Sequence, residues 1–309
     1  MVAMNAPVPS FSRRAFLGAL TGGAAALLIS GLFAGPVPCA GADDSPIQPD
    51  VVYGHKDGMA LTFDVIKPAK PNGAAILWIQ SGGWYSTWID TKIWPAVAKP
   101  FLDKDYTLFI VRHGSAPKYN IPEIVEDLRR SVRFIRLHAK DWGVNPDRLG
   151  VLGASAGGHL TLVLATTADD GDPKSADEVL RQSDRIAAAI ALFPPTDIRD
   201  WVTNPPDAIK KIAALKPPLT FDEKKAPDYS PLLHVTDKTA PALLVHGDKD
   251  ELVPIEHSKK MLAALEKAKV DAKFVVVEGA GHGFSDAQNK EQVIPAMLDW
   301  FDKYLAKKD

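Results

Sequence analysis

Short apolar runs alternate with longer amphipathic stretches along most of the chain. Runs that are hydrophobic at consecutive positions predict strands buried on both faces, as in a parallel sheet covered by helices. They lie at residues 74–80, 106–112, 148–155, 186–193, 241–247 and 273–279. Apolar residues that recur every three or four positions predict helices over residues 122–143, 258–270 and 291–308. The pattern therefore predicts one α/β domain with a mostly parallel central sheet and helices on both faces.

Two segments depart from this alternation. Residues 51–68 contain two alternating runs on either side of Lys56-Asp57-Gly58, which predicts an antiparallel hairpin. Residues 195–234 are rich in proline and weakly patterned, which indicates a short lid or cap over the ends of the strands.

The first 42 residues have the composition of a targeting segment. Arg13 and Arg14 precede a Gly/Ala-rich apolar stretch, and the small residues at 40–42 follow it. This order is typical of a secretory signal with its cleavage site. Residues 12–17 also resemble the twin-arginine export signal.

We therefore expect residues 1–42 to be a cleaved export signal and residues 43–309 to form the α/β domain, in the periplasm or outside the cell. The alternatives are an uncleaved membrane anchor and a lipoprotein attached through Cys39. Cleavage would remove Cys39, the only cysteine, so the mature protein would have no disulfide, thiol nucleophile or cysteine metal ligand.

Composition adds a limit on partners. The chain has 46% hydrophobic and 24% charged residues, enough to bury a sizeable core, and a formal net charge of −2. That charge gives no electrostatic reason to expect nucleic acid or an anionic membrane surface as a partner. The oligomeric state stays open.

A candidate nucleophile lies at the end of the third apolar run. Ser155 stands between Gly153 and Gly157, directly before a helical stretch, in a Gly-x-Ser-x-Gly pattern. Such a nucleophile elbow needs small flanking residues, and the following helix N-terminus favours a developing oxyanion. An ordinary glycine-rich turn is the alternative, so the serine needs partners.

A serine nucleophile requires a base and an acid that orients it. In this architecture the chain order is serine, acid, histidine. His282 lies in the loop after the last apolar run, and Asp250 lies in the loop after the preceding one. We interpret Asp248, in the same loop, as a residue that makes turn hydrogen bonds. The catalytic candidates are therefore Ser155, Asp250 and His282.

Backbone donors for an oxyanion are available at the end of the first run. Gly82 and Gly83 allow close approach of their N–H groups, and together with the N–H of Ala156 they predict a three-donor oxyanion hole. Three tryptophans are candidates for an aromatic substrate pocket, with core packing as the alternative: Trp84, Trp88 and Trp201.

Taken together, these motifs resemble the α/β-hydrolase superfamily. They run in the family's order as SGGW (81–84), residues 116–136, residues 145–160 around the elbow, HGDKDELVP (246–254) and GAGHGF (279–284). Within the superfamily the chain is most similar to exported esterases and lipases, including feruloyl and acetyl xylan esterase-like enzymes and relatives of hormone-sensitive lipase. The resemblance implies the α/β-hydrolase fold and a Ser-His-Asp mechanism without a metal or cofactor.

The chain departs from the family's pattern at two places. Gln80 and Ser81 stand where relatives have His-Gly before the Gly-Gly-Trp, so the supporting hydrogen bonds of that histidine must come from elsewhere. The run from Arg112 and His113 replaces the family's Asn-Tyr-Arg-Leu, which leads us to expect two cationic groups near the site. His159 matches the family, and we expect it to pack rather than to act in catalysis.

We interpret the chain as a serine carboxylesterase that acts on small acyl or aromatic acyl esters, including esters on carbohydrates, through an acyl-enzyme. The first alternative is a hydrolase of small amides, similar to peptidases or formamidases, that uses the same triad. The second is an exported binding scaffold without activity. Because all three triad positions are filled, the sequence favours an enzyme over the scaffold.

Overall fold

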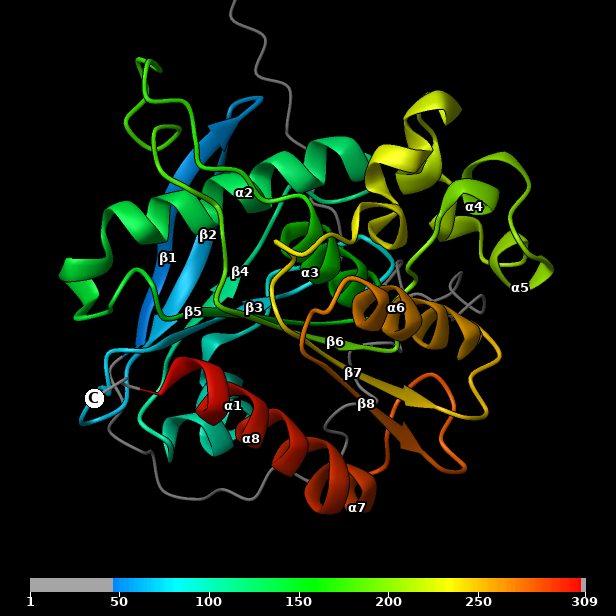
Figure 1. The fold of residues 1–309 in the computed structure, drawn as a ribbon. Helices are drawn as coiled ribbons and strands as arrows, with labels where there is room; N and C mark the ends of the chain where they lie inside the picture. The colour runs from blue at the N-terminus through cyan, green and yellow to red at the C-terminus, as the bar shows by residue number, and fades with distance from the viewer. Residues whose placement is uncertain (1–46, 307–309) are drawn as a thin grey trace, which may run out of the picture.

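The computed structural model describes residues 47–306. The expected export signal at residues 1–42 lies outside the described residues and stays a prediction. Within the described range the chain forms an eight-stranded sheet with the order β1-β2-β4-β3-β5-β6-β7-β8 (Figure 1). The strands are β1 (Ile47–Lys56), β2 (Met59–Ile66), β3 (Ala75–Ile79), β4 (Thr107–Val111), β5 (Leu149–Ala154), β6 (Ala188–Leu192), β7 (Ala242–Gly247) and β8 (Ala272–Val277).

The pairing of the strands confirms the predicted hairpin and the mostly parallel sheet. β1 pairs with β2 and β2 pairs with β4 in antiparallel fashion, and the remaining neighbours are parallel. Lys56 pairs with Met59 across a two-residue turn in which Asp57 and Gly58 both have positive φ. Such a turn matches the right-handed twist of a hairpin. Each of the six predicted apolar runs coincides with one strand to within one or two residues at either end.

Successive side chains of the central strands enter two separate cores. Leu77 and Val151 belong to the core on one face, and Ile76 and Leu152 belong to the core on the other. This division follows from the two-residue repeat of a strand. Helices α2, α3 and α6 cover the first face, and α1 and α8 cover the second (Figure 1). The helices are α1 (Trp94–Leu102), α2 (Ile121–Leu137), α3 (Ala156–Thr166), α4 (Arg199–Thr203), α5 (Asp207–Lys210), α6 (Glu256–Lys267), α7 (Asp286–Gln288) and α8 (Ile294–Leu305).

Local sequence signals mark the start of α2, one of the helices that pack into the first core. Asn120 caps α2 by accepting from the Glu123 N–H, and the Glu123 side chain accepts from the Asn120 N–H in return. This reciprocal capping box satisfies two backbone donors that a helix start leaves free. The helix predicted from the amphipathic pattern of residues 122–143 therefore begins at Ile121, directly after the Asn120 cap.

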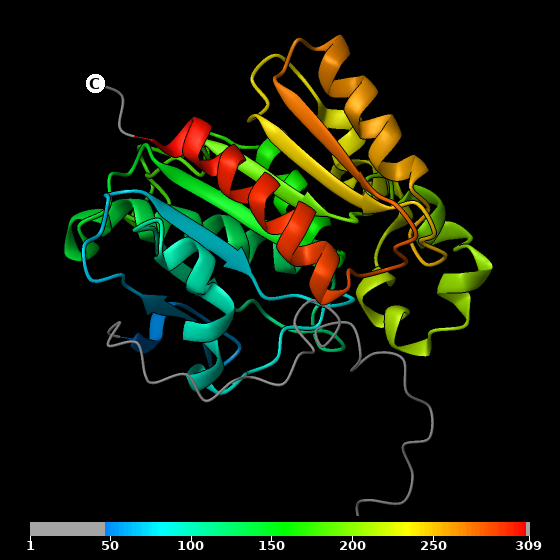
Figure 2. The same cartoon turned by 90° about the horizontal axis from the view of Figure 1, so that it is seen from below.

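The proline-rich segment at residues 195–234 contains α4, α5 and several single turns of 3-10 helix. These turns include η3 (Ala213–Leu215), η4 (Pro217–Leu219), η5 (Glu223–Tyr229) and η6 (Pro231–His234). Figure 2 shows α4 and α5 beyond the arrowheads of the sheet, at the carboxyl ends of its parallel strands. Its expected role as a lid stays a prediction. Within residues 47–306, no helix has the length and apolar character needed to cross a membrane.

Candidate active site

Ser155 occupies a sharp turn between β5 and α3. Its backbone has φ 53° and ψ −119°, a conformation that non-glycine residues rarely adopt and that costs about 1–3 kcal/mol. The Ser155 N–H donates to the carbonyl of Leu192 at 2.8 Å, which anchors the turn to β6. A Cβ at Gly153 would lie 2.3 Å from the carbonyl oxygen of Gly157, so only glycine fits there. The strand-to-helix turn expected from the Gly-x-Ser-x-Gly pattern is therefore present.

The structure brings the three catalytic candidates into one chain of hydrogen bonds. The Nε2 atom of His282 lies 2.8 Å from Oγ of Ser155, and its Nδ1 atom lies 2.7 Å from Oδ2 of Asp250. An ionised carboxylate only accepts, so we assign the proton to Nδ1, which leaves Nε2 to accept from the serine hydroxyl. This is the arrangement in which an imidazole can take the proton of a serine.

Asp250 is held by its own loop as well as by the histidine. Its Oδ1 atom accepts from the N–H groups of Leu252 and Val253, both at 2.9 Å. Burial by itself would raise the pKa of the carboxyl, but hydrogen bonds from His246 and His282 and the Val253 N–H hold that pKa well below its usual range. Asp250 is therefore ionised at neutral pH and presents a fixed negative charge to His282.

His246 is a supporting residue that the sequence reasoning passed over. Its buried ring donates from Nε2 to the carbonyl of Val253 at 2.8 Å, and Nδ1 accepts from the Ser258 hydroxyl at 2.8 Å. The same Nε2 lies 3.3 Å from Asp250. His246 thus connects the end of β7, the acid loop and α6. Its position four residues before Asp250 was the only sequence signal for this role. Asp248 accepts from the Gly279 N–H at 2.6 Å, which agrees with its interpretation as a turn residue.

The oxyanion donors require one correction. Gly82 and Tyr85 exchange two backbone hydrogen bonds of 3.0 Å across a turn in which Gly83 and Trp84 have φ 57° and 63°. The Gly82 N–H is therefore already used within this turn and is not offered as a free donor, while the oxyanion hole itself stays a prediction. Within the described residues, the N–H of Gly83 and that of Ala156, at the start of α3, have no acceptor. The arrangement offers two donors instead of three.

The turn that carries Gly83 is held from several sides. The side-chain amide of Gln80 donates to the carbonyl of Thr87, which supplies a support in place of the family's histidine. The Ala116 N–H donates to the carbonyl of Trp84 at 3.2 Å, and the Ser86 N–H donates to the Ser115 hydroxyl at 3.0 Å. The loop after β4 thus fixes the oxyanion turn despite its unusual sequence.

The expectation of two cationic groups near the site is wrong. The guanidinium of Arg112 turns toward the β1–β2 hairpin, where it lies 2.7 Å from the carboxylates of Asp64 and Asp50. Its charge is therefore neutralised locally. Burial lowers the pKa of His113 to about 4, so this imidazole is uncharged at neutral pH. The charges of the site come from Asp250 and, during proton transfer, from His282.

His159, expected to pack, is fully buried on α3 and makes two hydrogen bonds. Its Nδ1 atom accepts from the indole of Trp84 at 3.2 Å, and its Nε2 atom donates to the carbonyl of Tyr229 at 2.7 Å. Burial lowers its pKa to about 4, which keeps the ring neutral and able to do both. His159 joins the oxyanion turn, the nucleophile helix and the 195–234 segment.

Two of the three candidate tryptophans lie at a small apolar pocket beside the serine. This pocket of about 10 Å³ is lined by Gly83, Trp84, Ser155, Ala156, Pro195, Trp201, Ile209, Leu215, Leu252 and Val253. Trp84 and Trp201 are buried and meet edge to face, with ring centroids 6.2 Å apart. Trp88 does not line this pocket, and its side chain is 62% exposed. The substrate-binding role of the tryptophans stays a prediction. In the described part of the chain, no group of three His, Cys, Asp or Glu side chains is placed to hold a metal ion.

The sheet order, the elbow at the end of β5 and the histidine after β8 define an α/β-hydrolase fold. Residues 63–265 match the family model described as BD-FAE, so the chain belongs to the BD-FAE family. Among solved structures, a truncated form of a carbohydrate esterase from gut microbiota is similar, with a TM-score of 0.72 and 23% identity over 86% of this chain and 99% of that chain.

Two curated proteins are also similar in sequence. Esterase LipC of Mycobacterium tuberculosis is 25% identical over 76% of this chain and 59% of its own length. An acetylxylan esterase of Xylanibacter ruminicola is 26% identical over 78% of this chain and 48% of its own length. The chain therefore spans only about half the length of these curated relatives.

Proposed function

We propose that the protein is a serine carboxylesterase in which Ser155 is the nucleophile, His282 the general base and Asp250 the orienting acid. The observation that carries the proposal is the continuous chain of hydrogen bonds from Ser155 through His282 to Asp250, at a strained turn. Strain of this kind persists where the surrounding structure holds it, and it clusters at functional sites.

Each step of ester hydrolysis has a group in place for it. His282 takes the hydroxyl proton at Nε2 while Ser155 Oγ bonds to the ester carbonyl carbon. The N–H groups of Gly83 and Ala156 bind the oxyanion of the tetrahedral intermediate. His282 then gives its proton to the leaving alcohol, and a water molecule, deprotonated in the same way, releases the acid from the acyl-enzyme.

Asp250 contributes through its charge and its geometry. It fixes the tautomer that leaves Nε2 free to accept, and it stabilises the imidazolium that forms during proton transfer. Its depressed pKa means that the carboxylate stays ionised while this happens. His246, Leu252 and Val253 hold the carboxylate in place, so it does not need to reorganise during the reaction.

The substrate class is proposed from the pocket and the relatives. The small apolar pocket beside Ser155 suits a short acyl group. Similarity to an acetylxylan esterase and to a carbohydrate esterase supports esters on carbohydrates as substrates.

We also propose that the protein is exported to the periplasm or beyond, because Arg13 and Arg14 precede an apolar stretch. Replacing both arginines by lysine should leave the protein in the cytoplasmic fraction.

The proposal is tested with purified protein and p-nitrophenyl esters from acetate to octanoate, beside matched p-nitroanilides. We expect hydrolysis of short-chain esters and labelling of Ser155 by a fluorophosphonate, both absent in Ser155→Ala. A clear preference for the anilides would favour a small-amide hydrolase. Absence of both turnover and labelling would favour a binding scaffold.

A further inference from the structure

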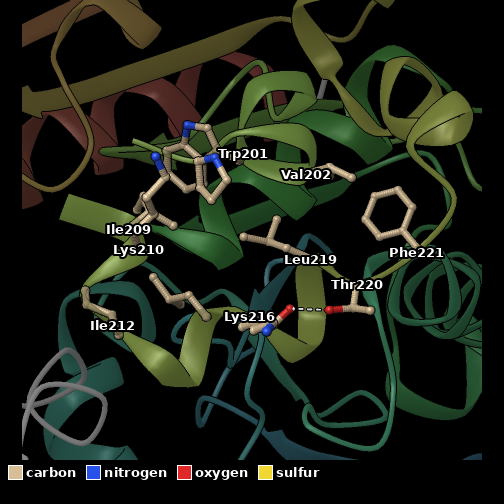
Figure 3. Close-up of a pocket in the computed structure, with 11 residues that line it drawn as sticks. Trp201, Val202, Ile209, Lys210, Ile212, Lys216, Leu219, Thr220 and Phe221 are labelled. Atoms are coloured by element: carbon tan, nitrogen blue, oxygen red, sulfur yellow. Dashed lines mark hydrogen bonds between the residues drawn. The ribbon is translucent and has the colours of Figure 1, made fainter. Parts of the chain in front are cut away.

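A second, larger cavity lies against the small pocket that contains Ser155. It has a volume of about 400 Å³ and lies within the 195–234 segment, around α4, α5 and the two following 3-10 turns (Figure 3). Its lining consists of Trp201, Val202, Pro205, Ile209, Lys210, Ile212, Leu215, Lys216, Leu219, Thr220 and Phe221. Trp201, Ile209 and Leu215 line both spaces, so they form the wall between them.

The small pocket lies on the acyl side of the serine. A leaving oxygen must face Nε2 of His282 to receive its proton, whereas the carbonyl oxygen must face Gly83 and Ala156. Gly83, Ala156 and Ser155 line the small pocket, and His282 is not among its lining residues in the described chain. In the proposed mechanism a leaving alcohol that faces His282 lies outside this pocket, which leaves the pocket for the acyl group.

Leu215 closes this pocket at the oxyanion turn. Its Cδ2 atom lies 2.7 Å from the position that a Cβ on Gly83 would occupy, so the side chain rests directly on the glycine. Leu215 ends the 3-10 turn η3 and is only 6% exposed. The remaining space beside Ser155, about 10 Å³, is close to the minimum that one water molecule needs. An acyl chain longer than a few carbons would collide with Leu215 or Ile209.

The larger cavity has the chemistry of a hydrocarbon site. Figure 3 shows Trp201, Val202, Ile209, Leu219 and Phe221 around it. The hydroxyl of Thr220 already donates to the carbonyl of Lys216 at 2.8 Å, and the residues Lys210 and Lys216 are exposed. A sugar would need several polar partners, and apart from the ammonium groups of Lys210 and Lys216 and the Thr220 hydroxyl this lining has no polar side chains. A saturated acyl chain needs none.

We propose that Leu215 determines the acyl-chain length that the enzyme accepts, and that the cavity behind it is a latent acyl-chain pocket. Leu215, with Ile209 and Trp201, separates this pocket from Ser155 and restricts the wild-type enzyme to short acyl groups. This inference rests on the proposed esterase function. It adds the substrate class, short saturated acyl esters, and the residue that sets it.

The test compares kcat/KM for p-nitrophenyl acetate and octanoate. In Leu215→Ala the two spaces join, and we expect the octanoate-to-acetate ratio to rise on the order of 10-fold or more, since each methylene that a pocket accepts is worth a factor of that order. Ile209→Ala, on the same wall, should shift the ratio in the same direction. Adding Leu219→Trp to Leu215→Ala narrows the cavity and should lower the ratio toward the wild-type value. Leu233→Ala is the matched control, because Leu233 is 44% exposed and lines neither space.

The outcomes separate the two proposals. A wild-type protein that neither turns over esters nor reacts with a fluorophosphonate would overturn the esterase function itself. An active, labelled wild type whose ratio is unchanged in Leu215→Ala and Ile209→Ala would overturn the acyl-length role alone. If thermal melting shows that Leu215→Ala is unfolded, Ile209→Ala and its combination with Leu219→Trp decide the question by the same ratio.

Discussion

The indole N–H of Trp84 donates to Nδ1 of His159 at 3.2 Å, and this bond ties the turn at Gly83 to helix α3, which begins directly after Ser155. The other ring nitrogen of His159 donates to the carbonyl of Tyr229, in the 195–234 segment. One neutral imidazole thus holds three segments that are far apart in the chain. We therefore expect the position of the Gly83 N–H to depend on His159, whose own backbone N–H donates to the carbonyl of Ser155 at 2.9 Å and whose side chain does not line the pocket beside Ser155.

Replacing His159 by Phe should keep the ring volume and remove both hydrogen bonds. Because the turn at Gly83 would lose a support, we expect kcat to fall more than KM changes, with fluorophosphonate labelling slowed but not abolished. Trp84→Phe removes the indole bond alone and should give a smaller effect in the same direction. Steady-state kinetics and labelling rates measure both. A His159→Phe variant that is destabilised yet has wild-type kcat would leave His159 with a structural role only.

Removing the charge of Asp250 should distinguish its role as the proposed orienting acid from the turn-forming role of Asp248. Asp250→Asn leaves the side chain's size but gives His282 the wrong tautomer, so we expect kcat to fall by about 10⁴-fold. Asp248→Asn is the matched control, because Asp248 contacts the Gly279 N–H and not the histidine. Its kcat should stay close to that of the wild type. Equal losses in the two variants would argue against Asp250 as the orienting acid.

Three histidines, the buried His113 and His159 and the half-buried His257 of α6, should make stability depend on pH. Burial lowers the pKa values of His113, His159 and His257 from 6.5 to about 4. Between these values the unfolded chain binds protons that the folded protein does not bind. The contribution of these histidines to the free energy of unfolding is therefore complete above pH 6.5 and is lost as the pH is lowered toward 4. The depressed pKa of Asp250 adds a further loss at lower pH.

This dependence can be measured by urea denaturation at a series of pH values across that interval. The midpoint should decrease with each step downward, and the decrease should be shallower in His159→Phe, which removes one of the three groups. A midpoint that does not change between pH 6.5 and pH 4 would contradict the lowered pKa values of these rings.

The elbow should tolerate no side chain at Gly153. A Cβ there would lie 2.3 Å from the Gly157 carbonyl, and backbone on both sides prevents relief, so we expect Gly153→Ala to cost about 3 kcal/mol or more and to abolish activity. Gly281→Ala is the matched control for stability, because its nearest neighbour would be 3.8 Å away. The melting temperature of Gly153→Ala should be clearly lower than that of Gly281→Ala. Similar melting temperatures would mean that the turn can move.

Much of this molecule follows from local pattern. Consecutive apolar positions require strands buried on both faces, so the parallel sheet and its covering helices could be predicted. The two-residue turn at Asp57-Gly58 specified the hairpin. Ser155, Asp250 and His282 could be chosen because parallel strands bring their carboxyl ends to one edge, and each residue follows a strand. The sequence alone therefore determined the strands and helices and the residues that stand at their ends.

The use of backbone donors, the pairing of charges and the size of the pocket depend on the orientation of backbone and side chains. Only the tertiary structure determines that orientation. The Gly82 N–H is used because Trp84 adopts a positive φ and closes a turn onto Tyr85. Arg112 turns toward the hairpin because the strand register brings Asp64 beside it on β2. Leu215 rests on Gly83 although the two residues are 132 positions apart in the sequence. Sequence determined which chemistry is present, and tertiary packing decided which donors stay free, which charges are neutralised and how much room the acyl group has. The reason is that hydrogen-bond direction and steric contact depend on distances between segments that no local pattern encodes.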